Sequence, residues 1–135
     1  MKIISIKYTH VAFSFATLFL RLGLGIIMLV AHGNDKLQHF SKYSAMFSDP
    51  FHLGRVTSLS LDIFAEFFCS CLIILGLFTR LACIPLIIST SVALFYAHHG
   101  DVFGMGERAT LFITGYITLL FLGPGKVSVD GMIGK

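Results

Sequence analysis

The chain has 135 residues, of which 56% are hydrophobic and only 13% are charged, and its mean hydropathy is +0.85. A soluble domain of this size has a large surface for its volume and needs more polar residues than these to cover it. The composition therefore excludes a soluble globular domain and predicts a surface that contacts a lipid bilayer. The formal net charge of +3 comes from scattered residues, which excludes the basic face of a nucleic-acid-binding protein.

Four apolar segments follow one another along the chain, and we expect each to cross the membrane. A spanning helix needs roughly 20 residues to cover a hydrocarbon core of ~30 Å. The first segment contains Arg21, which is unfavourable in a signal peptide, so we expect a retained helix. The predicted fold is all-α: a single domain over residues 1–135, a polytopic membrane four-helix bundle with helices at about 11–31, 59–78, 81–99 and 105–122.

The connections between these helices differ in length. Residues 32–58 form one long loop, whose aromatic residues predict a short amphipathic helix at the membrane interface. Only Thr79 and Arg80 separate the second helix from the third, which predicts a tight antiparallel hairpin. Residues 98–106 are rich in glycine and predict a second loop.

The distribution of lysine and arginine predicts the orientation in the membrane. Positively charged residues collect on the cytoplasmic side of membrane proteins. One side of the predicted bundle carries Lys2, Lys7, Arg80, Lys126 and Lys135, and the other carries Lys36, Lys42, Arg55 and Arg108. This slight excess predicts a multi-pass protein of the plasma (inner) membrane with both termini in the cytoplasm.

Two ionisable residues lie well inside the predicted helices. Arg21 is near the middle of the first helix, and Glu66 is inside the second. A charged side chain at the centre of a membrane costs roughly 2.5–3.5 kcal/mol on insertion scales, so such a group faces a partner or a wet cavity. Because their charges are opposite, we expect Arg21 and Glu66 to pair between these helices. The pair fits a structural role in helix register as well as it fits ligand binding or proton relay.

Helical spacing extends each of these positions into a polar stripe. One face of the first helix carries Thr17, Arg21, Gly25, Met28 and His32, and one face of the second carries Asp62, Glu66, Cys69, Ile73 and Gly76. The two stripes predict a polar pocket inside the bundle that opens toward the side of the long loop. No catalytic residue is assigned, and the candidate ligand-binding residues are Arg21, His32, Lys36, Glu66, His98 and Glu107.

The remaining polar residues favour simpler interpretations. Asp62 and Glu107 lie near the predicted membrane ends, where we expect them to be solvated. His98 and His99 fit the membrane interface, and a metal site would need a third ligand, so no metal is expected. The two cysteines of the second helix are two residues apart and point in directions about 200° apart, so we expect packing rather than a dithiol centre.

Several short motifs, taken in order, resemble the DoxX family. They are Arg-Leu-Gly-Leu-Gly at 21–25, His32-Gly33 with Lys36-Leu37, Ala65-Glu66, Leu75-Gly76-Leu77-Phe78-Thr79-Arg80-Leu81-Ala82, Glu107, and Gly123-Pro124-Gly125 with Ser128 and Asp130. The resemblance spans about residues 17–130 and implies a four-helix inner-membrane protein. It also implies an association with thiosulfate:quinone oxidoreductase, in which relatives form the membrane subunit, and with thiol and oxidative-stress handling. Carried over by position, the resemblance singles out Arg21, His32, Lys36, Glu66, Arg80 and Glu107.

Three functions are compatible with these features. The first is a redox-associated membrane subunit that binds a quinone or supports electron transfer by a partner oxidoreductase. The chain shows no haem, flavin or iron–sulfur motif and no autonomous catalytic motif, so an electron carrier would belong to that partner. The second is a carrier or binding protein for a small amphipathic or lipid-like ligand, with a homo-oligomer needed for transport. The third is a non-catalytic assembly subunit.

Overall fold

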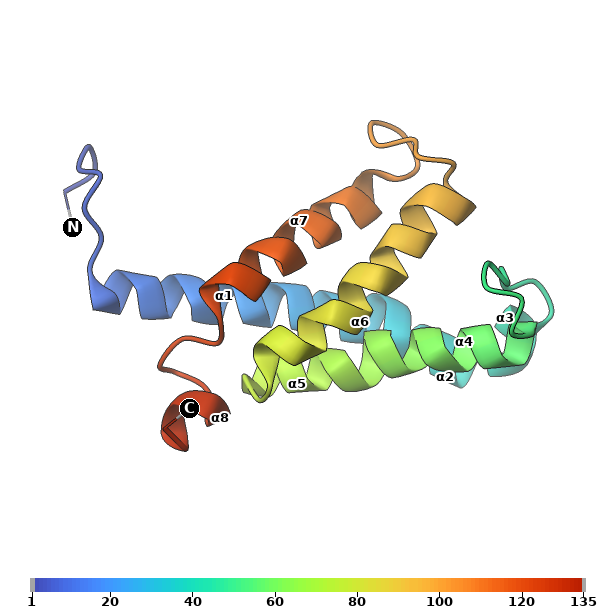
Figure 1. Ribbon diagram of the computed structural model, residues 1–135, viewed down its shortest axis with the longest axis horizontal. Helices are drawn as coiled ribbons and strands as arrows, with labels where there is room; N and C mark the ends of the chain where they lie inside the picture. Colours follow the sequence, from blue (N-terminus) through green and yellow to red (C-terminus); the bar gives the residue numbers. More distant parts are fainter. Residues whose placement is uncertain (1, 135) are drawn as a thin grey trace.

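A computed structural model describes residues 2–134, which contain helices and turns and no β-strand (Figure 1). Three helices in this part of the chain are long and apolar enough to cross a membrane: His10–Gln38, Arg55–Leu75 and Thr79–Ala97. The helix α7 (Glu107–Leu122) has 16 residues and is shorter than these three. The all-helical architecture is confirmed, while a fourth span remains a prediction.

The first long helix extends further than the sequence predicts. It runs through α1 (His10–Met28), the π-helical segment η1 (Leu29–Gly33) and α2 (Asn34–Gln38). Thr9 caps its start, because the Thr9 hydroxyl accepts a hydrogen bond from the Ala12 N–H at 3.1 Å. The predicted end near residue 31 is wrong, since the added turns pack against the second long helix. The loop assigned to residues 32–58 is therefore shorter and contains the helix α3 (Phe40–Ser44).

The second long helix consists of α4 (Arg55–Ile63), the π-helical segment η2 (Phe64–Cys69) and α5 (Ser70–Leu75). Gly76 ends it in a left-handed conformation with φ of 72°. The Gly76 N–H donates to the Ile73 carbonyl and the Leu77 N–H donates to the Leu72 carbonyl, which is a Schellman motif. The turn of the hairpin is therefore residues 76–78, and the predicted turn at Thr79 and Arg80 is wrong because the next helix already begins at Thr79.

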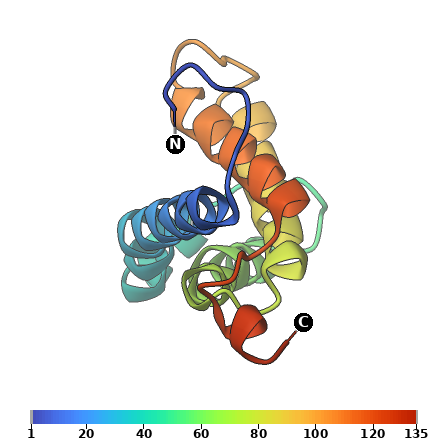
Figure 2. The same cartoon turned by 90° about the vertical axis from the view of Figure 1, so that its left-hand side faces the viewer.

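The third long helix, α6 (Thr79–Val92) with the π-helical η3 (Ala93–Ala97), packs along α7. α1 packs against α5 and α7, and η2 packs against α6. Seen from the end in Figure 2, the helices surround a common centre, and the C-terminal helix α8 (Val129–Met132) lies at the end where α5 turns into α6. The buried core contains Met28, Cys69, Ile73, Ala82, Cys83, Leu86, Tyr116 and Leu119.

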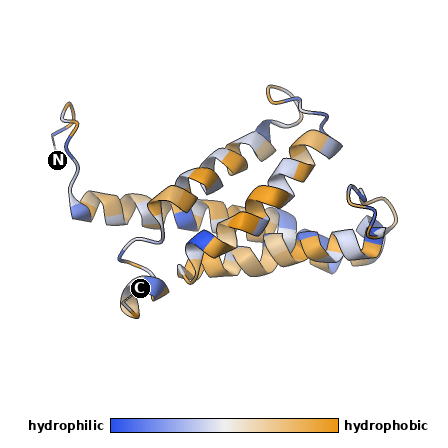
Figure 3. Ribbon diagram, viewed as in Figure 1, coloured by the Kyte–Doolittle hydropathy of each residue, from blue (hydrophilic) through white to orange (hydrophobic). Residues whose placement is uncertain are grey.

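The helices are hydrophobic along most of their length, as Figure 3 shows, and large apolar side chains lie exposed on them. Phe19 on α1 is 83% exposed, Leu81 on α6 is 66% exposed and Phe121 on α7 is 77% exposed. Large apolar surfaces of this kind are rare on soluble monomers. Such surfaces are stable in the hydrocarbon core of a membrane, because the backbone hydrogen bonds of each helix are made within the helix.

Close contact between the first two long helices depends on Gly33. A Cβ atom at this position would lie 2.8 Å from the backbone of Glu66, whereas a Cβ atom at Gly23 would meet nothing within 4 Å. We expect Gly33→Ala to destabilise the protein by about 1–3 kcal/mol, because overpacking forces the backbones apart. Gly23→Ala is the matched control and is expected to be neutral or slightly stabilising. Thermal unfolding of both variants tests this, and equal midpoints would contradict it.

Candidate functional site

A polar cavity of about 630 Å³ lies at the end of the bundle opposite the chain termini. In Figure 1, α6 and α7 run away from the first two long helices toward this end. The cavity is lined by side chains from all four of these helices, by Phe47 and Ser48 of the first loop and by residues of the loop before α7. The sequence-based prediction of a polar pocket on the long-loop side agrees with this position.

Lys36 is the centre of the charged groups in the cavity. Its ammonium lies 2.5 Å from Asp62 Oδ2 and 2.9 and 2.8 Å from the two carboxylate oxygens of Glu66. The side chains are mostly buried, with exposed fractions of 17% for Lys36, 12% for Asp62 and 7% for Glu66. One turn of helix separates Asp62 from Glu66, so both carboxylates face the same cation.

A fourth side chain joins this cluster from α6. The Ser89 hydroxyl lies 2.5 Å from Asp62 Oδ1 and 3.4 Å from Glu66 Oε1. Two carboxylates share one ammonium, so the fully ionised cluster has an excess of one negative charge. The site therefore places hydrogen-bond donors, acceptors and exchangeable protons together in a partly enclosed space.

π-helical segments bring these groups to the cavity. η1 supplies His32, η2 supplies Glu66, and η3 supplies Ala93 and Ala97 to the lining. A π-helical turn contains an extra residue, so it rotates the side chains that follow relative to a regular helix. Such segments occur often at functional sites. Each of the three long helices therefore departs from regular geometry at the level of the cavity.

The other predicted site residues surround the cluster. The His32 ring packs edge-on against the Phe112 ring, with centroids 5.8 Å apart. His98 also lines the cavity, and its Nδ1 atom is buried without a hydrogen-bond partner among the described residues. Glu107 is an exposed residue of the lining at the start of α7. The structure thus brings His32, Lys36, Glu66, His98 and Glu107 together.

Arg21 lies outside this group. It is only 2% exposed, and its guanidinium donates to four backbone carbonyls. Two of these carbonyls, Ile73 and Ile74, are in the last turn of α5, and each lies 3.1 Å from the guanidinium. The other two, Pro124 at 2.7 Å and Val127 at 2.6 Å, are in the C-terminal segment, residues 123–128 between α7 and α8. The predicted pairing of Arg21 with Glu66 is wrong, because Glu66 binds Lys36, about 22 Å further along the first helix at 1.5 Å per residue.

The first loop is held in place at the mouth of the cavity by Asp49. Its carboxylate accepts hydrogen bonds from the Ser58 hydroxyl and the N–H groups of Leu53 and Gly54, each at 2.9 Å. Desolvation opposes ionisation of Asp49, but these hydrogen bonds outweigh it and hold the pKa of the carboxyl below its ordinary value. The anchor is therefore ionised at neutral pH, and it positions Phe47 and Ser48.

Sequence reasoning missed Asp62 and Ser89 as members of the site. The expectation that Asp62 is solvated is wrong, since it binds Lys36 and Ser89. The available signal was the spacing of four residues between Asp62 and Glu66.

The cysteines behave as packing residues: all three are free, and Cys69 and Cys83 are buried in the core. Within residues 2–134, no group of three or more His, Cys, Asp or Glu side chains is arranged to hold a metal ion.

Comparison with known proteins places this arrangement in a family. Residues 16–99, more than half of the chain, match the DoxX family. That range contains the Lys36 cluster and the turn at Gly76, while the resemblance noted at Glu107 and beyond lies outside it. Searches among curated proteins and among solved structures find no match. From the match and the apolar helices, the chain belongs to the DoxX family and is a membrane protein.

Proposed function

We propose that this protein is an inner-membrane subunit associated with an oxidoreductase, and that it binds the headgroup of a lipid-soluble quinone in the cavity around Lys36. A partner oxidoreductase supplies the electrons. The observation that carries the proposal is the cavity itself, where an ammonium, a hydroxyl and two carboxylates lie within an otherwise apolar helical bundle. The family resemblance to a membrane subunit of a quinone-reducing enzyme supports the same choice.

The chemistry of a quinone fits these groups. Its two carbonyl oxygens accept hydrogen bonds, and Lys36 is one donor in the lining. The single O–H of Ser89 donates to Asp62 in this structure and becomes the second donor when it turns to a quinone oxygen, while Asp62 keeps its contact with Lys36. Lys36 contacts both oxygens of Glu66, so a ligand oxygen can replace one of these contacts without removing the ion pair. Reduction of the quinone to the quinol takes up two electrons and two protons. In the proposal the partner protein donates the two electrons, and the carboxyl groups that line the cavity relay the two protons from water.

A neutral headgroup is preferred over an anionic one. The cavity lining contains three carboxylates and two permanent cations, so its formal charge repels an anion; these residues are Asp62, Glu66, Glu107, Lys36 and Arg108. A carrier for a ligand with an anionic headgroup needs a free cation, and the Arg21 guanidinium is engaged with backbone carbonyls away from the cavity. The charge balance therefore supports the quinone hypothesis more strongly than the carrier hypothesis.

The proposal includes four spans with both termini in the cytoplasm. α7 is about 24 Å long at 1.5 Å per residue, and apolar, exposed Phe103 and Met105 precede it in the adjoining loop. Together these can cover a hydrocarbon core of ~30 Å. The cavity then opens toward the non-cytoplasmic face. Of the basic residues used for this orientation, Lys135 lies outside the described residues.

Native mass spectrometry of the purified protein with an added short-chain quinone tests this function. We expect the wild type to retain one quinone and Ser89→Ala to retain less, because that variant removes a donor while leaving the Lys36 ion pairs in place. Thr118→Ala is the matched control, since within residues 2–134 the Thr118 hydroxyl donates to the Thr114 carbonyl of its own helix and to no other group. Absence of a bound quinone in the wild type, with or without a redox partner, would reject the proposal.

A further inference from the structure

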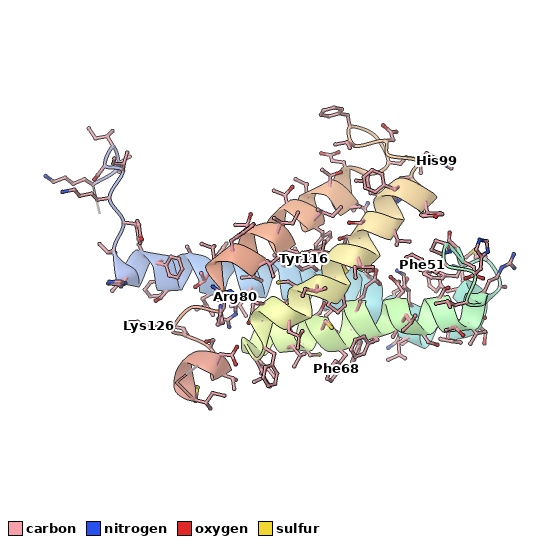
Figure 4. The ribbon with its side chains drawn as sticks, in the orientation of Figure 1. Phe51, Phe68, Arg80, His99, Tyr116 and Lys126 are labelled. Atoms are coloured by element: carbon pink, nitrogen blue, oxygen red, sulfur yellow. The ribbon has the colours of Figure 1, made fainter. Side chains whose placement is uncertain are left out.

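A second, apolar cavity of about 320 Å³ lies between α4 and α6. Its wall contains Phe47 and Phe51 of the first loop, Leu61 and Phe64 of the second long helix, and Pro85 and Ile88 of α6. Figure 4 shows Phe51 at the loop that covers this end of the bundle. These side chains carry no polar atoms, so this cavity suits a hydrocarbon chain rather than a polar group. We call it the apolar groove.

The apolar groove adjoins the polar cavity. Phe47, Asp62, Ser89 and Val92 line both. The hydrogen bond between Ser89 and Asp62 therefore lies at the boundary, with Lys36 and Glu66 on one side and the phenylalanines on the other. A ligand that occupies both spaces has a polar head and an apolar tail joined at this point.

The groove also lies on the surface that contacts lipid. Leu61 is 54% exposed, Phe64 is 49% exposed and Ile88 is 52% exposed, and all three belong to helices long and apolar enough to cross a membrane. A molecule dissolved in the bilayer can reach the groove sideways, between α4 and α6, without passing through water. The loop held by Asp49 covers the groove from the aqueous side through Phe47 and Phe51.

We infer that the apolar groove holds the isoprenoid or alkyl tail of the quinone and that the ligand enters from the bilayer between α4 and α6. The inference rests on the proposed function, since the headgroup occupies the polar cavity. It specifies where the tail lies, because a quinone without a tail occupies only one of the two cavities. It also gives α4 and α6 a role as the two sides of a lateral opening.

The test compares two quinones with the same headgroup, one without a tail and one with a ten-carbon tail, binding to the protein in lipid nanodiscs. Affinities are expressed relative to the quinone concentration in the lipid. A tail that moves from lipid to protein gains packing but little hydrophobic free energy, so we expect the tailed quinone to bind roughly tenfold more tightly. Ile88→Trp fills the groove and is expected to abolish this advantage while leaving the affinity for the tailless quinone unchanged.

Ile84→Trp is the matched control, because Ile84 is on the same helix, is 47% exposed and does not line either cavity. It should keep the full advantage of the tail. If Ile88→Trp also keeps that advantage, or if the wild type binds both quinones equally, the tail lies elsewhere and the inference is overturned while the proposed function stands. If the wild type binds neither quinone, both fall.

Discussion

Replacing Arg21 with leucine is expected to produce a large loss of stability. The substitution removes four hydrogen bonds from a guanidinium to backbone carbonyls and leaves those carbonyls in an apolar interior. A hydrogen bond to a charged group contributes about 1.5–3 kcal/mol, and the four are not additive, so we expect a loss on the order of 3–5 kcal/mol. Thermal unfolding in detergent measures it.

Arg80 provides the control for this prediction. It donates to the Leu120 carbonyl at 3.1 Å and the Phe121 carbonyl at 3.2 Å, but it is exposed. Arg80→Leu is therefore expected to cost about 1 kcal/mol. Arg21→Lys should be intermediate, because an ammonium keeps the charge but cannot reach carbonyls of two separate segments in the planar geometry of a guanidinium. Equal unfolding midpoints for Arg21→Leu and Arg80→Leu would contradict the conclusion that the hydrogen bonds of Arg21 hold α5 and the C-terminal segment together.

Replacing Lys36 with methionine is expected to cause a loss of stability of similar size. It leaves the carboxylates of Asp62 and Glu66 near each other without a cation in a largely buried site. Removing one partner of a buried ion pair costs about 3–5 kcal/mol. We expect this loss in the thermal unfolding of Lys36→Met, together with loss of quinone binding.

Glu66→Gln should be much milder than Lys36→Met, because it leaves a balanced pair between Lys36 and Asp62. We expect a cost of about 1 kcal/mol for the single change. Adding Glu66→Gln to Lys36→Met removes one of the two unpaired carboxylates and should recover part of the lost stability. A double-mutant cycle measures this coupling. If the two effects simply add, Lys36 and Glu66 do not interact as the structure shows.

Helical periodicity predicted which side chains are buried but not which of them meet. The stripe of Thr17, Arg21, Gly25 and Met28 is the buried set of α1. Spacing along a helix defines a face, however, and does not fix the height at which a neighbouring helix crosses it. The pattern therefore pairs Arg21 with Glu66, the opposite charge well inside the next predicted helix. The sequence pattern places Lys36 in the long loop, outside the helix, and so gives no indication that it pairs with Glu66.

The end of the first helix and the π-helical segments were beyond prediction for a physical reason. Most of residues 32–38 are polar, and a run of polar residues ordinarily marks the end of a membrane-spanning helix. Here the ion pairs of Lys36 hold them against the second helix. A π-helical turn such as η2 depends on contacts with neighbouring helices and has no local signature comparable to a glycine or a proline. By contrast, Gly76 was visible in the sequence and could have placed the turn of the hairpin correctly.

The most direct test of the quinone site is photolabelling with a quinone whose headgroup carries a light-activated azide, followed by mass spectrometry of the peptides. The labelled residues should come from the lining of the polar cavity, on the segments around Lys36, Ser89 and Phe112. An excess of unmodified quinone should suppress the label. Label confined to lipid-facing residues such as Phe19 and Phe121, or label that excess quinone does not reduce, would contradict the assignment of the Lys36 cavity as the quinone site.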